Sequence, residues 1–178
     1  MKNLYLILVL IGLTVNLKAQ LDWKAEMDSI KNLWNNSELN FPATKFNTVI
    51  GYTFNKGIHE EGYGEVHSVI DKDGNVIESV SAKTFKLNQP QIDRLLLILN
   101  DTNTFRWGES GCFIPHHSFV FYDSENQVTN CIDICLLCSQ TDAMKYSPKM
   151  RYGALHPKGR EKMKQFFLDI GMPIEGNR

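Results

Sequence analysis

The sequence lacks an excess of basic residues. It contains 19 lysines and arginines against 20 aspartates and glutamates. Without residues 1–19, which include Lys2 and Lys18, 17 basic and 20 acidic residues remain, a net charge of −3. Proteins that bind nucleic acid through charge present a clustered basic face. The composition therefore argues against a nucleic-acid partner.

Long apolar runs are also missing after the N-terminus. The run from Leu4 to Val15 follows Lys2 and precedes the small residue Ala19. That order is typical of a secretory signal peptide, and the run is shorter than the roughly 20 residues of a membrane span. We therefore predict a signal peptide at residues 1–19, export to the periplasm or the cell exterior, and no membrane span in the mature chain.

Familiar catalytic motifs are absent as well. After His59 and Glu60, a zinc-protease motif requires a second histidine where the sequence has Tyr63. Ser110 lies between glycines, but the spacing and the strand-turn-helix setting of a nucleophile elbow are missing. The sequence therefore favours a protein that is not an enzyme.

Helical periodicity predicts three helices, at residues 21–36, 87–100 and 157–171. In the second, Asn88 is a suitable N-cap and Gln91 follows three residues later, as in a capping box. The first carries an apolar stripe whose tryptophans we expect in the core, made of Trp23, Met27, Ile30 and Trp34.

Strand-like segments predict two hairpins. The first joins residues 65–70 to 76–85 through DKDGN, and the second joins residues 116–123 to 127–138 through Ser124–Asn126. Hairpins with separate helices form an α+β protein. We therefore expect residues 20–178 to form a single α+β domain, with an antiparallel sheet of two hairpins and helices packed on one face.

Cysteine is scarce, but three of the four cysteines lie in CIDICLLC, residues 131–138. Cys131 and Cys135 would lie about 13 Å apart in a strand, whereas a disulfide requires Cα atoms within about 7 Å. Cys135 and Cys138 can approach each other in a tight turn at the end of the strand. The cluster therefore contains a C-x2-C pair and one cysteine apart from it.

The expected hairpin turn determines what lies opposite these cysteines. If Asp123 pairs with Gln127, His117 lies opposite Asp133, on the face of the sheet that carries Cys135. There, Asp133 either orients the histidine or is a charge on an open sheet face. The preceding loop brings a further cysteine to the same end of the sheet. We therefore predict a convergent set of Cys112, His117, Cys135 and Cys138.

A shift of one residue in this pairing would change the histidine. It would move His116, in place of His117, to the cysteine face. The apolar pattern favours the shift, because Phe119 and Phe121 would then share a face with the isoleucines of the second strand. Turn chemistry favours the unshifted pairing, with His117 in the set and His116 as the reserve.

Three chemistries fit the cluster, and unpaired buried thiols are a fourth alternative. Three cysteines and one histidine form a common zinc set, and four protein ligands make a structural site. Exported cysteines also form disulfides, here Cys135 with Cys138, which would make the protein a stapled interaction or inhibitor module. A redox pair fits less well, because a reactive C-x2-C normally begins a helix whereas CLLC ends a strand.

Residues 85–173 resemble an uncharacterised family of small exported bacterial proteins. The resemblance is carried by a C-x2-P-x-H and I-C-x2-C pattern, here Cys112, Pro115, His117, Ile134, Cys135 and Cys138. It implies that His117 is the histidine of the site and that Cys131 lies outside it. It implies no reaction. The resulting expectation is an exported binding protein with a structural zinc site and a protein or small-molecule partner.

Overall fold

The computed structural model describes residues 20, 22–55, 68–108, 113–144, 148–151 and 153–174. The contacts divide the chain into two units, Met1–Asn36 and Ser37–Arg178. The predicted signal peptide lies outside the described residues. Among the described helices, none has the length and apolar character needed to cross a membrane.

In the first unit, the predicted helix is confirmed at residues 22–36. Met27, Ile30 and Trp34 are partly buried along its apolar stripe. Trp23 is 62% exposed, so the expectation that it belongs to a core is wrong.

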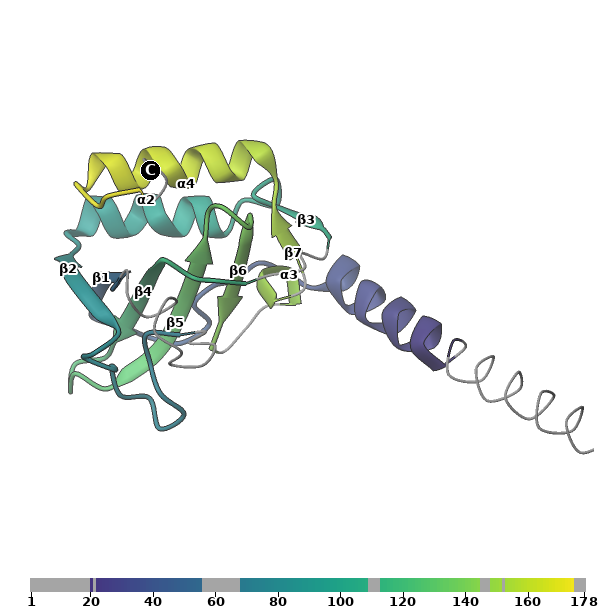
Figure 1. Ribbon diagram of the computed structural model, residues 1–178, viewed down its shortest axis with the longest axis horizontal. Coiled ribbons are helices and arrows are strands. Elements are labelled where there is room, and N and C mark those ends of the chain that lie inside the picture. Colours follow the sequence, from purple (N-terminus) through teal and green to yellow (C-terminus); the bar gives the residue numbers. More distant parts are fainter. Residues whose placement is uncertain are drawn as a thin grey trace, which may run out of the picture. The chain divides into compact units, whose positions relative to one another are not determined.

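The second unit contains an antiparallel sheet, which has seven strands over the described residues (Figure 1). Its strand order is β2-β1-β4-β5-β6-β7-β3. The α+β class with an antiparallel sheet is therefore confirmed. Along the chain the elements are β1 Thr48–Phe54, β2 Ser81–Lys86, α2 Gln89–Leu99, β3 Phe105–Trp107, β4 His117–Tyr122, β5 Val128–Cys135, β6 Gln140–Ala143, α3 Pro148–Arg151, β7 Gly153–Leu155 and α4 Pro157–Asp169.

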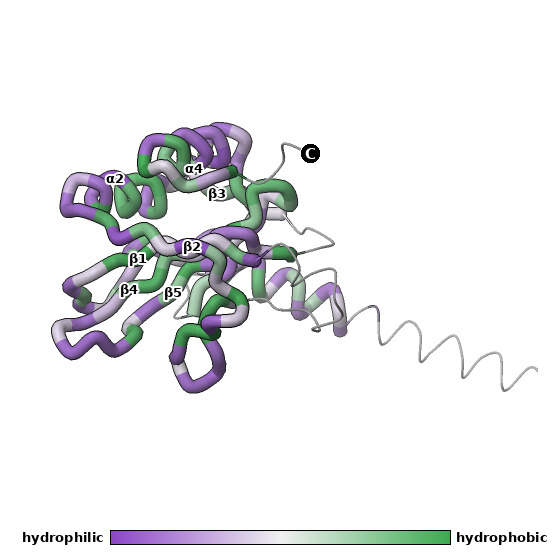
Figure 2. The backbone as a smooth tube through the Cα atoms, turned by 60° about the vertical axis from the view of Figure 1, so that its left-hand side comes forward, coloured by the Kyte–Doolittle hydropathy of each residue, from purple (hydrophilic) through white to green (hydrophobic). Residues whose placement is uncertain are grey.

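Helices α2 and α4 lie side by side (Figures 1 and 2). The predicted capping box of α2 is present, with the Asn88 side chain accepting from the Gln91 amide at 3.0 Å. From α4, Phe166 and Phe167 pack on Phe119 of β4, with ring centroids 5.8 and 5.7 Å from it. We call the side of the sheet that Phe119 occupies the helix face.

The first predicted hairpin is only partly correct. Its turn is present, with Gly74 at a φ of +86°, but over the described part of the hairpin, residues 68–85, one bridge joins the two sides, between Ile70 and Val76. Strand β2 pairs instead with β1, over a register that includes Ile50 opposite Lys86. Local sequence signals the turn, whereas the choice of partner strand depends on the whole sheet.

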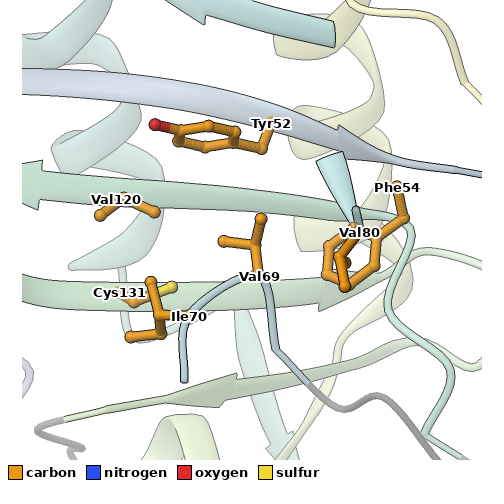
Figure 3. Packing of buried hydrophobic residues seen from close by; sticks show 7 residues of the cluster. All are labelled: Tyr52, Phe54, Val69, Ile70, Val80, Val120 and Cys131. Carbon is orange, nitrogen blue, oxygen red and sulfur yellow. The ribbon is translucent and has the colours of Figure 1, made fainter. Parts of the chain in front are cut away.

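The residues around this turn cover the second face of the sheet. Val69, Ile70 and Val80 pack on buried side chains of three strands, namely Tyr52, Phe54, Val120 and Cys131 (Figure 3). We call Ser68–Val80 the covering segment, and the side beneath it the covered face. The sheet is therefore buried on both sides near its centre.

The second predicted hairpin is confirmed as β4 and β5, but its register is not the one expected. Asp123 does pair with Gln127, and Asn126 in the turn has a positive φ, +60°. An irregularity follows between Phe121 and Tyr122, since Tyr122 lies opposite Val128 while Phe121 lies opposite Asn130. This bulge inserts one extra residue in β5.

The bulge reverses which side chains face each other farther along the hairpin. His117 pairs with Ile134, so the prediction that it lies opposite Asp133 is wrong. The physical reason is burial: the shifted register directs Phe119 and Ile132, which are opposite each other and fully buried, to the helix face together. The turn determines the residue pair next to it, and burial of apolar side chains determines the pairs farther along β4 and β5.

Candidate functional site

Cys135 and Cys138 flank the turn between β5 and β6. Cys135 is the last residue of β5, is fully buried and pairs with Gln140. The Cys138 amide donates to Cys135 Sγ at 3.1 Å. Ser139 then reverses the chain with a φ of +55°, and its amide donates to the Leu136 carbonyl at 3.3 Å. The C-x2-C segment therefore forms the tight turn that its spacing predicts.

The left-handed residue of this turn gives a direct stability prediction. Serine at φ +55° carries a steric cost that glycine avoids, so Ser139→Gly should raise the free energy of unfolding by about 0.5–1 kcal/mol. As a control, Ser124→Gly, in the exposed turn before Asn126, should lower it slightly through chain entropy. Urea denaturation measures both. Destabilisation by Ser139→Gly would contradict this account of the turn.

The thiols of β5 differ in their surroundings. Cys131 and Cys135 are both buried, and both are free cysteines in the structure. Burial, followed by the nearby Asp133, raises the pKa of Cys131 well above its usual range. Cys131 therefore behaves as a small core residue on the covered face, whereas Cys138 is only partly buried. Cys112 lies outside the described residues.

His117 faces away from the cysteines. It pairs with Ile134 and is 1% exposed, and its ring packs on Phe167 with 4.4 Å between centroids. Because a carbonyl only accepts, Nε2 donates to the Pro173 oxygen at 2.8 Å. Burial lowers the pKa of His117 to about 4, with the Pro173 hydrogen bond opposing the shift. His117 is therefore a neutral core histidine that fastens the C-terminal segment.

Asp133 lies on the covered face and is 4% exposed, so neither expected role for it is correct. Ser118, directly opposite in β4, donates its hydroxyl to Asp133 Oδ1. Ser68 and the Val69 amide of the covering segment also hydrogen-bond to this carboxyl. Burial raises the pKa of Asp133 to about 7, against those hydrogen bonds and with help from the charge of Asp142.

Sequence reasoning missed this polar cluster because its members come from three separate segments. Ser68 and Ser118 carry no motif, and both read as ordinary strand or turn residues. The one available signal is the charged Asp133 within the apolar run of β5, flanked by Ile132 and Ile134. A carboxyl in such a run is either exposed or supplied with buried donors.

Metal ligation requires several donors close together. Among the described residues, no three histidine, cysteine, aspartate or glutamate side chains are grouped so as to hold a metal ion. The predicted ligands Cys135 and Cys138 share a turn, while His117 lies on the other face and Cys112 is outside the described ranges. The two cysteines of the turn are therefore the part of the predicted set that the structure brings together.

Comparison with known proteins adds no relative. The chain matches no protein-family model, no curated protein and no solved structure. The functional argument therefore depends on the geometry of the chain itself.

Proposed function

We propose that this is an exported binding protein that holds a soft metal ion, zinc in the first instance, at the turn formed by Cys135 and Cys138. The observation that carries the proposal is the amide of Cys138 donating to Cys135 Sγ at 3.1 Å. A thiolate accepts such a bond better than a thiol does, and it is the thiolate that binds metal. The turn is thus suited to the ligand form of cysteine.

The remaining ligands are expected from the same end of the sheet. Cys112 comes five residues before His117, the first residue of β4, and β4 pairs with the last residues of β5. Five residues span at most about 17 Å, so chain length permits Cys112 to reach the turn. With Cys135 and Cys138 this gives three thiolate ligands, and structural zinc sites are commonly built on three or four cysteines.

A disulfide between Cys135 and Cys138 is the alternative, and it implies an interaction or inhibitor module without metal. Export favours it, because cysteines commonly pair in oxidising compartments. It would use the same two sulfurs, so the two chemistries exclude each other. A thiol–disulfide redox protein is the weaker third alternative, since the turn joins two strands and has no helix dipole at its sulfurs.

Metal content and thiol count distinguish these possibilities. The chain, purified without a polyhistidine tag, should contain about one zinc per molecule by elemental analysis and should react at its cysteines after denaturation. Cys135→Ser or Cys138→Ser should abolish stoichiometric zinc. Cys131→Ala, which removes a thiol outside the turn, should retain it.

Three results would overturn the proposal. The first is a chain without metal whose cysteines are unreactive after denaturation, which would establish the stapled module. The second is a chain without metal and with reactive thiols even after zinc is supplied. The third is zinc that survives substitution of either turn cysteine.

A further inference from the structure

We propose that the helix of residues 22–36 is a dimerisation element, which pairs in parallel with the same helix of a second copy of this chain. This association concerns the first unit alone and does not depend on the cysteine turn. Three observations support it: the spacing of the apolar side chains along the helix, the exposure of some of them, and the charges beside them.

The apolar side chains form a seam with the spacing of a coiled coil. From Trp23 the steps are four residues to Met27, three to Ile30 and four to Trp34. Steps that alternate between four and three repeat every seven residues, so Met27 and Trp34 occupy the a positions of a heptad, and Trp23 and Ile30 the d positions. The b, c and f positions, on the far side of the helix, hold polar or small residues, namely Ala25, Asp28, Ser29, Asn32, Asn35 and Asn36.

A single chain leaves apolar surface of this helix open to solvent. Trp23 in the seam is 62% exposed, and Leu33, which borders the seam, is 57% exposed. Met27 and Ile30 are partly buried. A helix of 15 residues is only marginally stable in water by itself, because most helical stability comes from burying an apolar face. A partner that covers Trp23 would therefore stabilise the helix as well as bind it.

The charged residues beside the seam determine which partner fits and in which direction. Glu26 occupies a g position, and Lys24 and Lys31 occupy e positions. In a parallel pair each g residue faces the e residue five positions later on the other helix, so Glu26 faces Lys31 of the second copy on both sides of the pair. In an antiparallel pair e residues face each other, which would bring Lys24 against Lys31. The charges of this helix therefore complement those of its own copy in the parallel direction.

A lipid surface fits this helix less well. Residues 22–36 carry two basic and three acidic side chains, a net charge of −1. Helices that lie on anionic membranes are rich in lysine and arginine on their polar face. Here the far side of the helix carries Asp28 and no basic residue. A second copy of the chain is thus the occupant that the charges favour.

The first test locates the interface. Sedimentation equilibrium of residues 20–178, the predicted mature chain, should show an average mass that rises with concentration toward twice that of the monomer. Ile30→Asp, which puts a charge into the seam, should weaken this association about tenfold or more. Ser29→Asp is the matched control, because it adds the same charge on the far side of the helix, and it should change the association by less than about twofold.

The second test determines the direction of pairing. Glu26→Lys or Lys31→Glu alone turns attraction into repulsion on both sides of the pair, and each should weaken the dimer about fivefold. The double variant, Glu26→Lys with Lys31→Glu, restores opposite charges between the copies and should recover the original affinity within about twofold. Residues five apart do not face each other on one helix, so this recovery reports a contact between copies.

Four results would overturn the proposal. The first is a chain that stays monomeric at submillimolar concentration. The second is a dimer that Ile30→Asp and Ser29→Asp weaken equally or not at all, which would place the interface elsewhere. The third is a stronger dimer in Lys31→Glu, since that change would improve the antiparallel pair. The fourth is a monomer whose tryptophan emission shifts to the blue on vesicles of phosphatidylcholine and phosphatidylglycerol, which would assign the seam to lipid.

Discussion

Replacing Gly159 by alanine is expected to destabilise the protein by about 2–3 kcal/mol, although alanine normally stabilises a helix relative to glycine by about 1 kcal/mol. A Cβ at this position in α4 would lie 2.4 Å from the Thr104 carbonyl oxygen and 2.7 Å from Thr104 Cα. These are backbone atoms, so no side-chain rotation relieves the overlap. Equilibrium denaturation of the variant and the unsubstituted chain measures the difference.

Thr104 cannot move away without breaking other interactions. It is fully buried, its hydroxyl donates to the Ile98 carbonyl at 2.6 Å, and its carbonyl accepts from the His156 amide at 2.9 Å. Gly171→Ala is the matched control: its φ is +74° with open space around the added methyl, so it should cost only about 1 kcal/mol. A more stable Gly159→Ala variant would contradict the close approach of α4 to this loop.

The free energy of unfolding is expected to fall as the pH rises from about 4 to about 7, and the substitution Asp133→Asn is expected to remove this fall. In the folded chain, burial first of all raises the pKa of Asp133 from 3.8 to about 7. The unfolded chain ionises at the lower value, so ionisation favours unfolding across this window and has no further effect above it. A pKa shift of this size corresponds to a change of up to about 4 kcal/mol in the free energy of unfolding.

The measurement is the free energy of unfolding against pH for the variant and the unsubstituted chain. The variant should become increasingly more stable than the unsubstituted chain from pH 4 to pH 7, and the difference in free energy of unfolding should then stay constant. Asp142→Asn, which removes only the smaller contribution of the cross-strand charge, should reduce the slope in part. Parallel curves for Asp133→Asn and the unsubstituted chain would mean that this carboxyl is already ionised at low pH.

Features determined by neighbouring residues could be predicted from the sequence. The capping box of Asn88 and Gln91 and the left-handed Asn126 each depend on a few adjacent positions, and both are present. Strands β3, β6 and β7 have only three or four residues, too few for an alternating pattern to be recognised. They acquire their structure from the strands they pair with in the sheet.

The candidate site shows the same division at the level of single residues. The turn between Cys135 and Cys138 follows from their spacing. The face of the sheet on which His117 lies does not follow from the turn alone. It depends on the bulge in β5, which lets the hairpin keep the turn at Asn126 and still bury Phe119. The burial of Asp133 depends on the covering segment, which is contributed from more than fifty residues earlier in the chain. For His117 the apolar pattern of the two strands indicated the observed register, whereas for Asp133 no local pattern indicates the segment that covers it.

The position of β3 at the sheet edge has a consequence for the order of folding. Phe105–Trp107 pairs with Gly153–Leu155, a strand that comes much later in the chain and is therefore synthesised later. The His117 ring likewise binds a carbonyl at residue 173. Contacts so distant in sequence form slowly, since a long loop must close before they stabilise anything. The sheet can therefore close only after β7 and the segment that reaches Pro173 have been synthesised.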